Sequence, residues 1–132
     1  MRILLDTSAY SALRRGHEGV LDLCSRSETV GMNATVIGEL LRGFRKGARH
    51  RQNELGLRGF LAEPRVSLLV VDADTADCYA EISEGLRKVG RPIGANDIWI
   101  AASAMQYGLR LVTTDEHFNE VSQIAKDVFT PS

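Results

Sequence analysis

The chain has 132 residues, of which 44% are hydrophobic, and its 16 basic and 17 acidic residues give a formal net charge of −1. This length and apolar content are typical of one domain with its own core, which we expect to span residues 1–132. The balanced charge argues against a simple nucleic-acid-binding arm. No apolar run approaches the roughly 18 residues that a membrane span requires.

The first residues and the cysteines indicate a cytoplasmic protein. Arg2 is followed by only three apolar residues before Asp6, which is too short for the apolar part of a signal peptide. Cys24 and Cys78 each stand alone inside a helical pattern. We therefore expect buried, free thiols in a reducing compartment, with neither a disulfide framework nor a zinc site.

Short apolar runs alternate with helical spacings along the whole chain. Strands are predicted where apolar runs are bounded by turn or capping residues, and helices where apolar residues recur at intervals of three and four. In chain order, the predicted elements are strand 3–5, helix 8–15, a second helix around 20–24, strand 29–33, helix 36–44, a polar helix or loop at 45–59, strand 66–71, helix 72–89, helix 95–107, strand 109–113, short helix 115–121 and an edge strand at 128–129.

This alternation predicts an α/β fold, a three-layer α/β/α sandwich with a mainly parallel sheet of four to five strands. The segment 66–71 gives the strongest strand signal, because it contains SLLVV. Trp99 stands in an Ala- and Ile-rich helix, so we expect it to pack and not to stack on a base. The apolar residues that we expect in the core are Leu13, Leu40, Leu41, Phe44, Leu69, Val71, Ile98, Ile100 and Leu111.

Four acidic residues lie where a predicted strand ends and a helix begins, or on a helix that follows a strand. They are Asp6, Glu39, Asp97 and Asp115. In a parallel sheet the carboxyl ends of the strands form one edge, and ligands bind there. Four converging carboxylates repel one another unless a cation lies between them, and a hard divalent cation takes oxygen ligands. The set therefore predicts a Mg²⁺ or Mn²⁺ site and phosphate-ester chemistry.

Each acid also has a simpler explanation. Asp6 and Asp115 can cap the helices that follow them, and Asp97 lies in the first turn of its helix, where a negative charge suits the helix dipole. Glu39 lies at the flank of the apolar face of its helix and can be a surface residue. The shared placement of all four favours one common site over four separate roles.

The charged residues between positions 42 and 65 form a basic stripe. It contains seven Arg or Lys residues and two Glu residues, a net charge of +5. Such a stripe can hold a phosphate backbone, and it can equally be a solvated helix face. Only proximity to the four acids would favour the first interpretation.

Four motifs in the correct order resemble those of PIN-domain ribonucleases, and most of all the VapC-type toxins of bacterial toxin–antitoxin pairs. The motifs are LLDTSAY near the start, T-x-x-x-E-L-x-x-G at 35–43, NDIWIAASA at 96–104 and LVTTDEHF at 111–118. The resemblance extends from Ile3 to about Phe129. It implies a PIN-like fold and an endoribonuclease that acts as a toxin.

The resemblance also assigns roles to individual residues. It makes Asp6, Glu39, Asp97 and Asp115 the catalytic, metal-binding acids, with the first and third as the more constant ligands. Further implications are a Mg²⁺ cofactor that Mn²⁺ can replace, an RNA substrate, a VapB-type antitoxin as partner and a homodimer. Transfer, ribosomal and messenger RNA all remain open as targets. The residues that it makes supporting members of the site are Ser8, Asn96 and Thr114.

Three alternatives share parts of this pattern. A receiver-type signalling domain also has an acidic Mg²⁺ pocket, but it needs an acidic pair after the first strand, where Asp6 stands alone. Asp72 can serve as its third-strand acid, whereas Lys126 precedes the last strand instead of following it. A haloacid-dehalogenase-like phosphatase needs a second Asp at position 8, which is Ser8. A PIN fold kept only for binding is disfavoured because no expected acid is missing.

Overall fold

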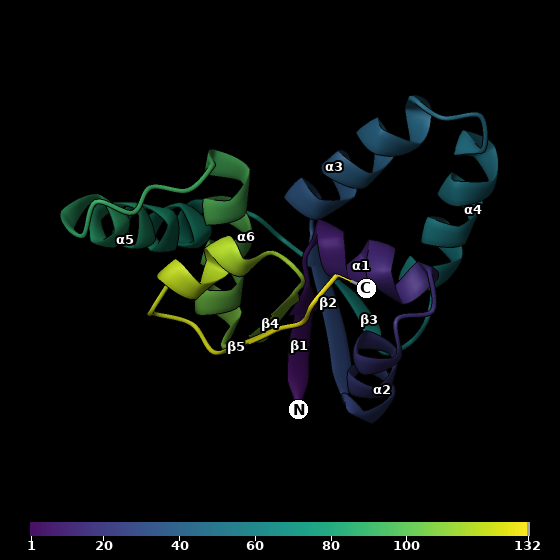
Figure 1. Cartoon of the computed structure of the whole chain (residues 1–132), viewed down its shortest axis with the longest axis horizontal. Coiled ribbons are helices and arrows are strands. Elements are labelled where there is room, and N and C mark those ends of the chain that lie inside the picture. Colours follow the sequence, from purple (N-terminus) through teal and green to yellow (C-terminus); the bar gives the residue numbers. More distant parts are fainter. Residues whose placement is uncertain (132) are drawn as a thin grey trace.

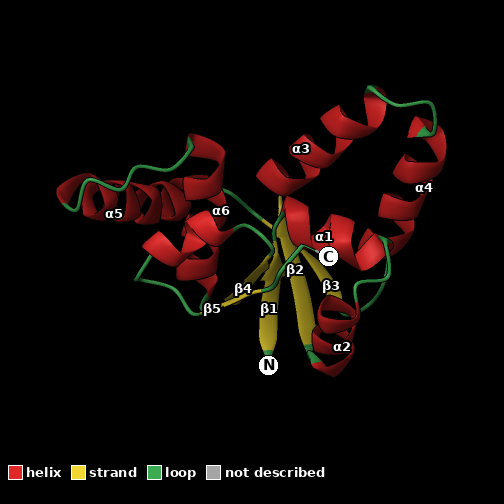
Figure 2. Ribbon diagram, in the orientation of Figure 1, coloured by secondary structure: helices red, strands yellow, loops and turns green. Residues whose placement is uncertain are grey.

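The computed structural model describes residues 1–131, and Ser132 lies outside the described residues. Five strands, six α-helices and one 3₁₀ helix are present in this part (Figure 1, Figure 2). In chain order they are β1 (Arg2–Leu5), α1 (Thr7–Arg14), α2 (Glu18–Arg26), β2 (Thr29–Asn33), α3 (Ala34–Arg45), α4 (His50–Leu61), β3 (Val66–Leu69), α5 (Ala73–Lys88), α6 (Ala95–Tyr107), β4 (Arg110–Thr113), η1 (Glu116–Glu120) and β5 (Lys126–Val128).

All five strands are parallel and form one sheet in the order β3-β2-β1-β4-β5. The predicted α/β fold is therefore confirmed, with five strands. α1 and α2 lie on one side of the sheet, and α5 and α6 on the other (Figure 1). Because the chain leaves β1 toward β2 and later returns to β4 on the other side of β1, the strand order reverses between β1 and β4. Ligands of open parallel sheets bind at the carboxyl ends of the strands at such a point.

The two strands that flank this point are buried on both faces. Ile3, Leu4 and Leu5 of β1 have no exposed surface, and neither have Leu111 and Val112 of β4. A continuous apolar run is what a strand needs when helices cover both faces of the sheet. The rest of the predicted core divides into two groups. Buried are Leu40, Ile98 and Ile100, and packed against the core while partly buried are Leu13, Leu41, Phe44 and Leu69.

The prediction that Val71 belongs to the core is wrong. Val71 is 36% exposed, and β3 ends two residues earlier, at Leu69. β3 lies at the edge of the sheet, where Leu68 is 60% exposed. Apolar composition gives a strong strand signal, but it does not distinguish an edge strand from a central one. Trp99 does pack as expected, with its ring centroid 4.4 Å from that of Tyr79.

Several predicted boundaries also shift. The polar segment 45–59 forms helix α4, which begins at His50 and ends at Leu61, because Leu57 is buried in the core. The short helix predicted at 115–121 is the 3₁₀ helix η1, and the last strand is Lys126–Val128 instead of 128–129. The predictions for β2 and α6 are confirmed at both ends.

The two cysteines are free thiols, as predicted, with Cys24 buried and Cys78 half-buried. Within residues 1–131, none of the helices combines the length and the apolar character needed to cross a bilayer.

Candidate active site

The four predicted acids line one cavity of about 310 Å³ at the carboxyl ends of β1 and β4. Asp6 directly follows β1, and Asp115 lies two residues beyond β4, which pairs with β1. Asp97 lies in the first turn of α6, and Glu39 lies in the middle of α3. We call this space the acid cavity. Its lining residues are Asp6, Thr7, Ser8, Ser11, Glu39, Asp97, Ile100 and Asp115.

Asp6 is the most deeply buried of the four, with 4% of its surface exposed. Its Oδ1 accepts hydrogen bonds from the Ala9 N–H and the Ser8 hydroxyl, both at 2.7 Å, and its Oδ2 accepts one from the Thr113 hydroxyl at 2.6 Å. Burial raises the pKa of this carboxyl, and the three donors oppose that effect. Asp6 is also the N-cap of α1, so capping and site membership hold together.

Glu39 and Asp115 each have partners of their own. The Thr7 hydroxyl donates to Oε1 of Glu39, and Nδ2 of Asn96 donates to Oε2 at 3.2 Å. Asp115 caps η1 by accepting from the His117 N–H at 2.9 Å, and its Oδ1 is 2.8 Å from Nδ1 of His117. The predicted supporting residue Asn96 thus contacts an acid directly and restricts its orientation.

The pKa of Asp97 depends on its burial and on the charges of the other three acids. Its side chain is half-buried, and burial together with the charges of Asp115, Glu39 and Asp6 raises the pKa from 3.8 to about 6. The charge of His117 acts in the opposite direction. Three carboxylates on other elements are therefore close enough to disfavour ionisation of this one. A favourable interaction with the dipole of α6 therefore does not account for the surroundings of Asp97.

Hydroxyl groups connect the ends of β1 and β4. The Ser8 oxygen accepts from the Thr114 N–H at 2.9 Å and lies 3.3 Å from Oγ1 of Thr113. Thr113 also accepts from the Asp115 N–H at 2.9 Å. The predicted residue Thr114 therefore contacts this network only through its backbone N–H. The threonine hydroxyl in the network belongs to Thr113.

Sequence reasoning missed four residues of the site, Thr7, Ser11, Thr113 and His117. Thr7 and Thr113 are each next to a residue that the motifs did single out. The available signal was their position, because both lie at or just beyond the carboxyl end of a predicted strand, at the edge where the acids were expected. His117 had no signal beyond its place two residues after Asp115.

The donor set fits a hard divalent cation in chemistry. The cavity is lined by carboxylate and hydroxyl oxygens, and no Lys or Arg lines it. Among residues 1–131, however, no group of three or more His, Cys, Asp or Glu side chains is placed so that it could hold a metal ion as it stands. The carboxylates of Glu39 and Asp115 interact with Thr7 and His117, and both oxygens of Asp6 accept hydrogen bonds. Direct coordination by all four acids requires some of these contacts to open.

The basic stripe does not reach this cavity, because none of its residues lines it. Arg45 pairs with Glu54 at 3.3 Å, Arg49 bonds to Gln52, and Arg65 donates to backbone carbonyls of α2 and the turn after it. The interpretation as a phosphate-binding stripe therefore lacks the proximity that it needed.

The residues that a receiver-type domain would use also lie elsewhere. Asp72 caps α5 in a reciprocal arrangement with Thr75, and the Lys126 ammonium donates to the carbonyls of Val121 and Ile124.

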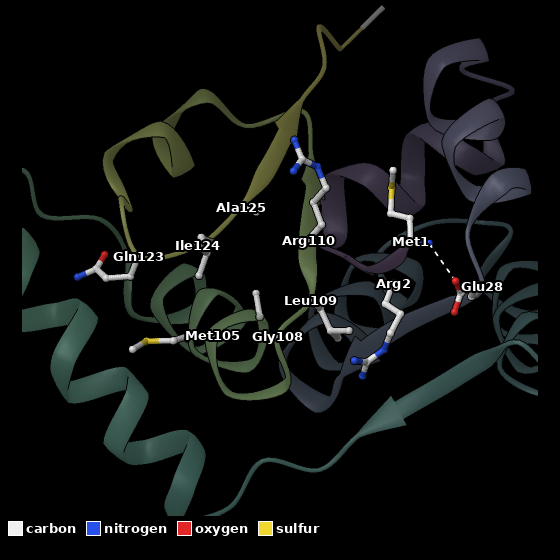
Figure 3. Close-up of a pocket in the computed structure, with 11 residues that line it drawn as sticks. Met1, Arg2, Glu28, Met105, Gly108, Leu109, Arg110, Gln123, Ile124 and Ala125 are labelled. Atoms are coloured by element: carbon white, nitrogen blue, oxygen red, sulfur yellow. Dashed lines mark hydrogen bonds and ion pairs between the residues drawn. The ribbon is translucent and has the colours of Figure 1, made fainter.

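A separate cavity of about 490 Å³ opens at the amino ends of β1 and β4, where Arg2 and Arg110 begin these strands (Figure 3). It contains none of the predicted site residues.

Comparison with known proteins shows the family of the chain. A model of the PIN domain matches residues 3–124. The ribonuclease VapC1 of Haemophilus influenzae strain R2866 is 39% identical over 118 residues, 86% of each chain, and the ribonuclease VapC5 of Mycobacterium tuberculosis is 30% identical over 87% of this chain and 84% of that one. The structure of VapBC2 from Rickettsia felis bound to a promoter DNA fragment covers 97% of this chain and 98% of that chain, with a TM-score of 0.83 and 26% identity. The chain belongs to the PIN-domain family and, within it, to the VapC ribonucleases.

Proposed function

We propose that this chain, as one domain over residues 1–132, is a metal-dependent endoribonuclease and the toxin of a toxin–antitoxin pair. The observation that carries the proposal is the convergence of Asp6, Glu39, Asp97 and Asp115 on one cavity, where burial and the charges of the other three acids raise the pKa of Asp97 to about 6. Membership of the VapC ribonucleases supports RNA as the substrate. The two free thiols fit a reducing cytoplasm.

Asp6 and Asp97 would hold Mg²⁺, for which Mn²⁺ can substitute, and Glu39 and Asp115 would complete the site directly or through water. When bound, such a cation neutralises the phosphodiester, lowers the pKa of a bound water and stabilises the leaving oxygen. The protein's own groups set the geometry. Among them, Thr113 fixes one oxygen of Asp6. We expect products with a 5′-phosphate and a 3′-hydroxyl, because water attacks and not the ribose 2′-hydroxyl.

The surroundings of the acid cavity support cleavage within a strand. Through Asp115 the cavity adjoins a second cavity of about 860 Å³, which is also lined by His117 and Lys126. Through Ser11 it adjoins a third, smaller cavity beside α1. These two spaces beside the acid cavity leave room for an RNA strand to continue past the scissile phosphate.

The test is cleavage of RNA by the purified protein with Mg²⁺ and with excess EDTA, followed by mapping of the new 5′ ends. We expect internal cuts that need the metal and that leave a 5′-phosphate. Cleavage that proceeds undiminished in excess chelator would overturn the metal-dependent mechanism.

The proposed partner is a small VapB-type antitoxin, and the proposed assembly contains a homodimer of this chain. The Rickettsia felis structure is of a VapBC pair on promoter DNA, which supports such a partner here. An antitoxin Arg or Lys at the acid cavity would match its charge, because guanidinium pairs well with clustered carboxylates. Co-expression with the product of the adjacent gene should yield a complex that lacks ribonuclease activity. A toxin that stays active and elutes alone would contradict the pairing.

A further inference from the structure

A small cavity of about 170 Å³ lies between α1 and the pair formed by α3 and α4. Ser11 lines both this cavity and the acid cavity, so the two spaces are neighbours along α1. No carboxylate lines the smaller space. We call it the arginine cavity, and its lining residues are Tyr10, Ser11, Arg14, Arg15, Phe44 and Asn53.

The two arginines stand one helical turn from the acid cavity. Arg14 and Arg15 follow Ser11 by three and four positions, and side chains at these intervals share one face of a helix. One turn of α-helix rises about 5 Å. An RNA strand that leaves the acid cavity past Ser11 therefore passes both guanidinium groups within about one helical turn.

The guanidinium groups are available to an anion. Within residues 1–131, Arg14 has neither an ion pair nor a side-chain hydrogen bond, and Arg15 donates only to the carbonyl of Pro131, at 3.3 Å. Guanidinium groups bind phosphate through paired, charge-assisted hydrogen bonds. The cavity thus offers positive charge beside a cluster of negative charge, which is the pattern that a bridging phosphodiester chain requires.

A glycine of α4 makes room for Arg14. A Cβ at Gly56 would lie 2.8 Å from Nη2 of Arg14, closer than side-chain contacts allow. The guanidinium therefore lies along the backbone of α4. Gly59 of the same helix has no atom within 4 Å of an added Cβ, so the two glycines form a matched pair for a test.

We propose that Arg14 and Arg15 form a subsite for a backbone phosphate of the RNA strand, on one side of the scissile phosphate. The inference rests on the proposed ribonuclease function and adds the route of the strand, from the four acids past Ser11 to the end of α1. The simpler role for two arginines at this place is to favour the C-terminal end of the α1 dipole. That role affects stability alone, whereas a phosphate subsite affects how the length of the substrate changes its cleavage.

The test uses the full chain and a series of oligoribonucleotides that share one cleaved sequence and extend by one to four nucleotides on either side. For the wild type, we expect kcat/KM to rise about tenfold or more when the extension on one side reaches the subsite. The double variant Arg14→Gln/Arg15→Gln should lose that gain. Its binding should also depend less on salt, because each lost phosphate contact lowers the slope of log K against log salt by about 0.7 for a single strand. Arg26→Gln, which removes a charge from α2 that pairs with Asp22, is the control.

The glycine pair keeps the test decisive if the double variant does not fold. Gly56→Ala displaces the Arg14 guanidinium and should lose part of the gain with length, whereas Gly59→Ala makes the same change in helix propensity and should keep it. If the wild type shows the gain in kcat/KM with substrate length, and this gain survives in the arginine variants and in Gly56→Ala, the subsite alone is overturned. A wild type that cleaves no RNA overturns the ribonuclease function instead. Variants that keep the gain with length but lose binding of the co-expressed antitoxin would assign the cavity to a protein partner and overturn the subsite.

Discussion

The Thr113 hydroxyl donates to Oδ2 of Asp6 at 2.6 Å and so joins the carboxyl end of β4 to that of β1. Both side chains are buried, and the same hydroxyl oxygen accepts the N–H of Asp115 at 2.9 Å. One uncharged side chain therefore fixes two of the four acids relative to each other. The arrangement of Asp6 and Asp115 depends on this contact as well as on β1 and β4, which they follow.

Replacing Thr113 by Val should damage both stability and cleavage. The change keeps the shape and removes the donor to a buried carboxylate, and hydrogen bonds to charged groups contribute about 1.5–3 kcal/mol. We expect a loss of that order in the free energy of unfolding at neutral pH, measured by urea denaturation, together with slower cleavage. Thr113→Ser restores the hydroxyl and should recover most of both. Equal behaviour of the Val and Ser variants would show that the hydroxyl does not position Asp6.

The four acids should differ from other acids in their effect on cleavage. We expect Asp6→Asn and Asp97→Asn each to lower the single-turnover rate by at least about 10³-fold, roughly 4 kcal/mol in barrier. Glu39→Gln and Asp115→Asn should also be severe but retain more activity. Asp72→Asn is the control, because Asp72 caps α5 and does not line the acid cavity. Wild-type cleavage by Asp97→Asn would reduce Asp97 to a helix-terminus residue.

The stability of the metal-free protein should depend on pH through Asp97. Its pKa is about 6 in the folded state, against 3.8 for a free side chain. The folded state therefore holds this proton more tightly, and the stability that it contributes is present below about pH 4 and lost as the pH rises through about 6. In EDTA, the free energy of unfolding should fall across this range more steeply for the wild type than for Asp97→Asn. Parallel curves from urea denaturation at stepped pH would contradict the assigned environment.

Two of the acids were predictable from the fold class, whereas Glu39, in the middle of α3, was singled out by its motif. Asp6 and Asp115 follow apolar runs that had to be parallel strands, and such strands bring their carboxyl ends to one edge. Thr113 was not predictable in the same way, since its role arises from a contact with a residue 107 positions away. Its position at the end of a strand places Thr113 at the edge where the acids were expected, but it does not identify Asp6 as the partner.

The errors in the fold have a similar origin. Val71 and Leu68 are as apolar as core residues, but Val71 lies beyond the end of β3 and Leu68 lies on that edge strand, so both are exposed. The segment of helix α4 is ambiguous in sequence because it is polar and contains Gly56 and Gly59. Its packing through Leu57 is a tertiary effect. Local pattern determines where an element forms more reliably than it determines which neighbours the element will have.

The central claim is that the four carboxylates form one cation site and not four separate helix ends. The claim predicts opposite responses of one residue in two conditions. In EDTA, Asp97→Asn should stabilise the protein, because it removes a carboxylate whose charge is disfavoured by burial and by the neighbouring acids. With Mg²⁺, the wild type should gain stability and the variant should not, since a ligand that binds the folded state alone raises the melting temperature.

Thermal melting of the wild type and Asp97→Asn, each with EDTA and with Mg²⁺, tests this most directly. We expect the variant to melt higher than the wild type in EDTA, and Mg²⁺ to raise the melting temperature of the wild type only. A variant that melts lower in EDTA, with no response of the wild type to Mg²⁺, would contradict the shared site.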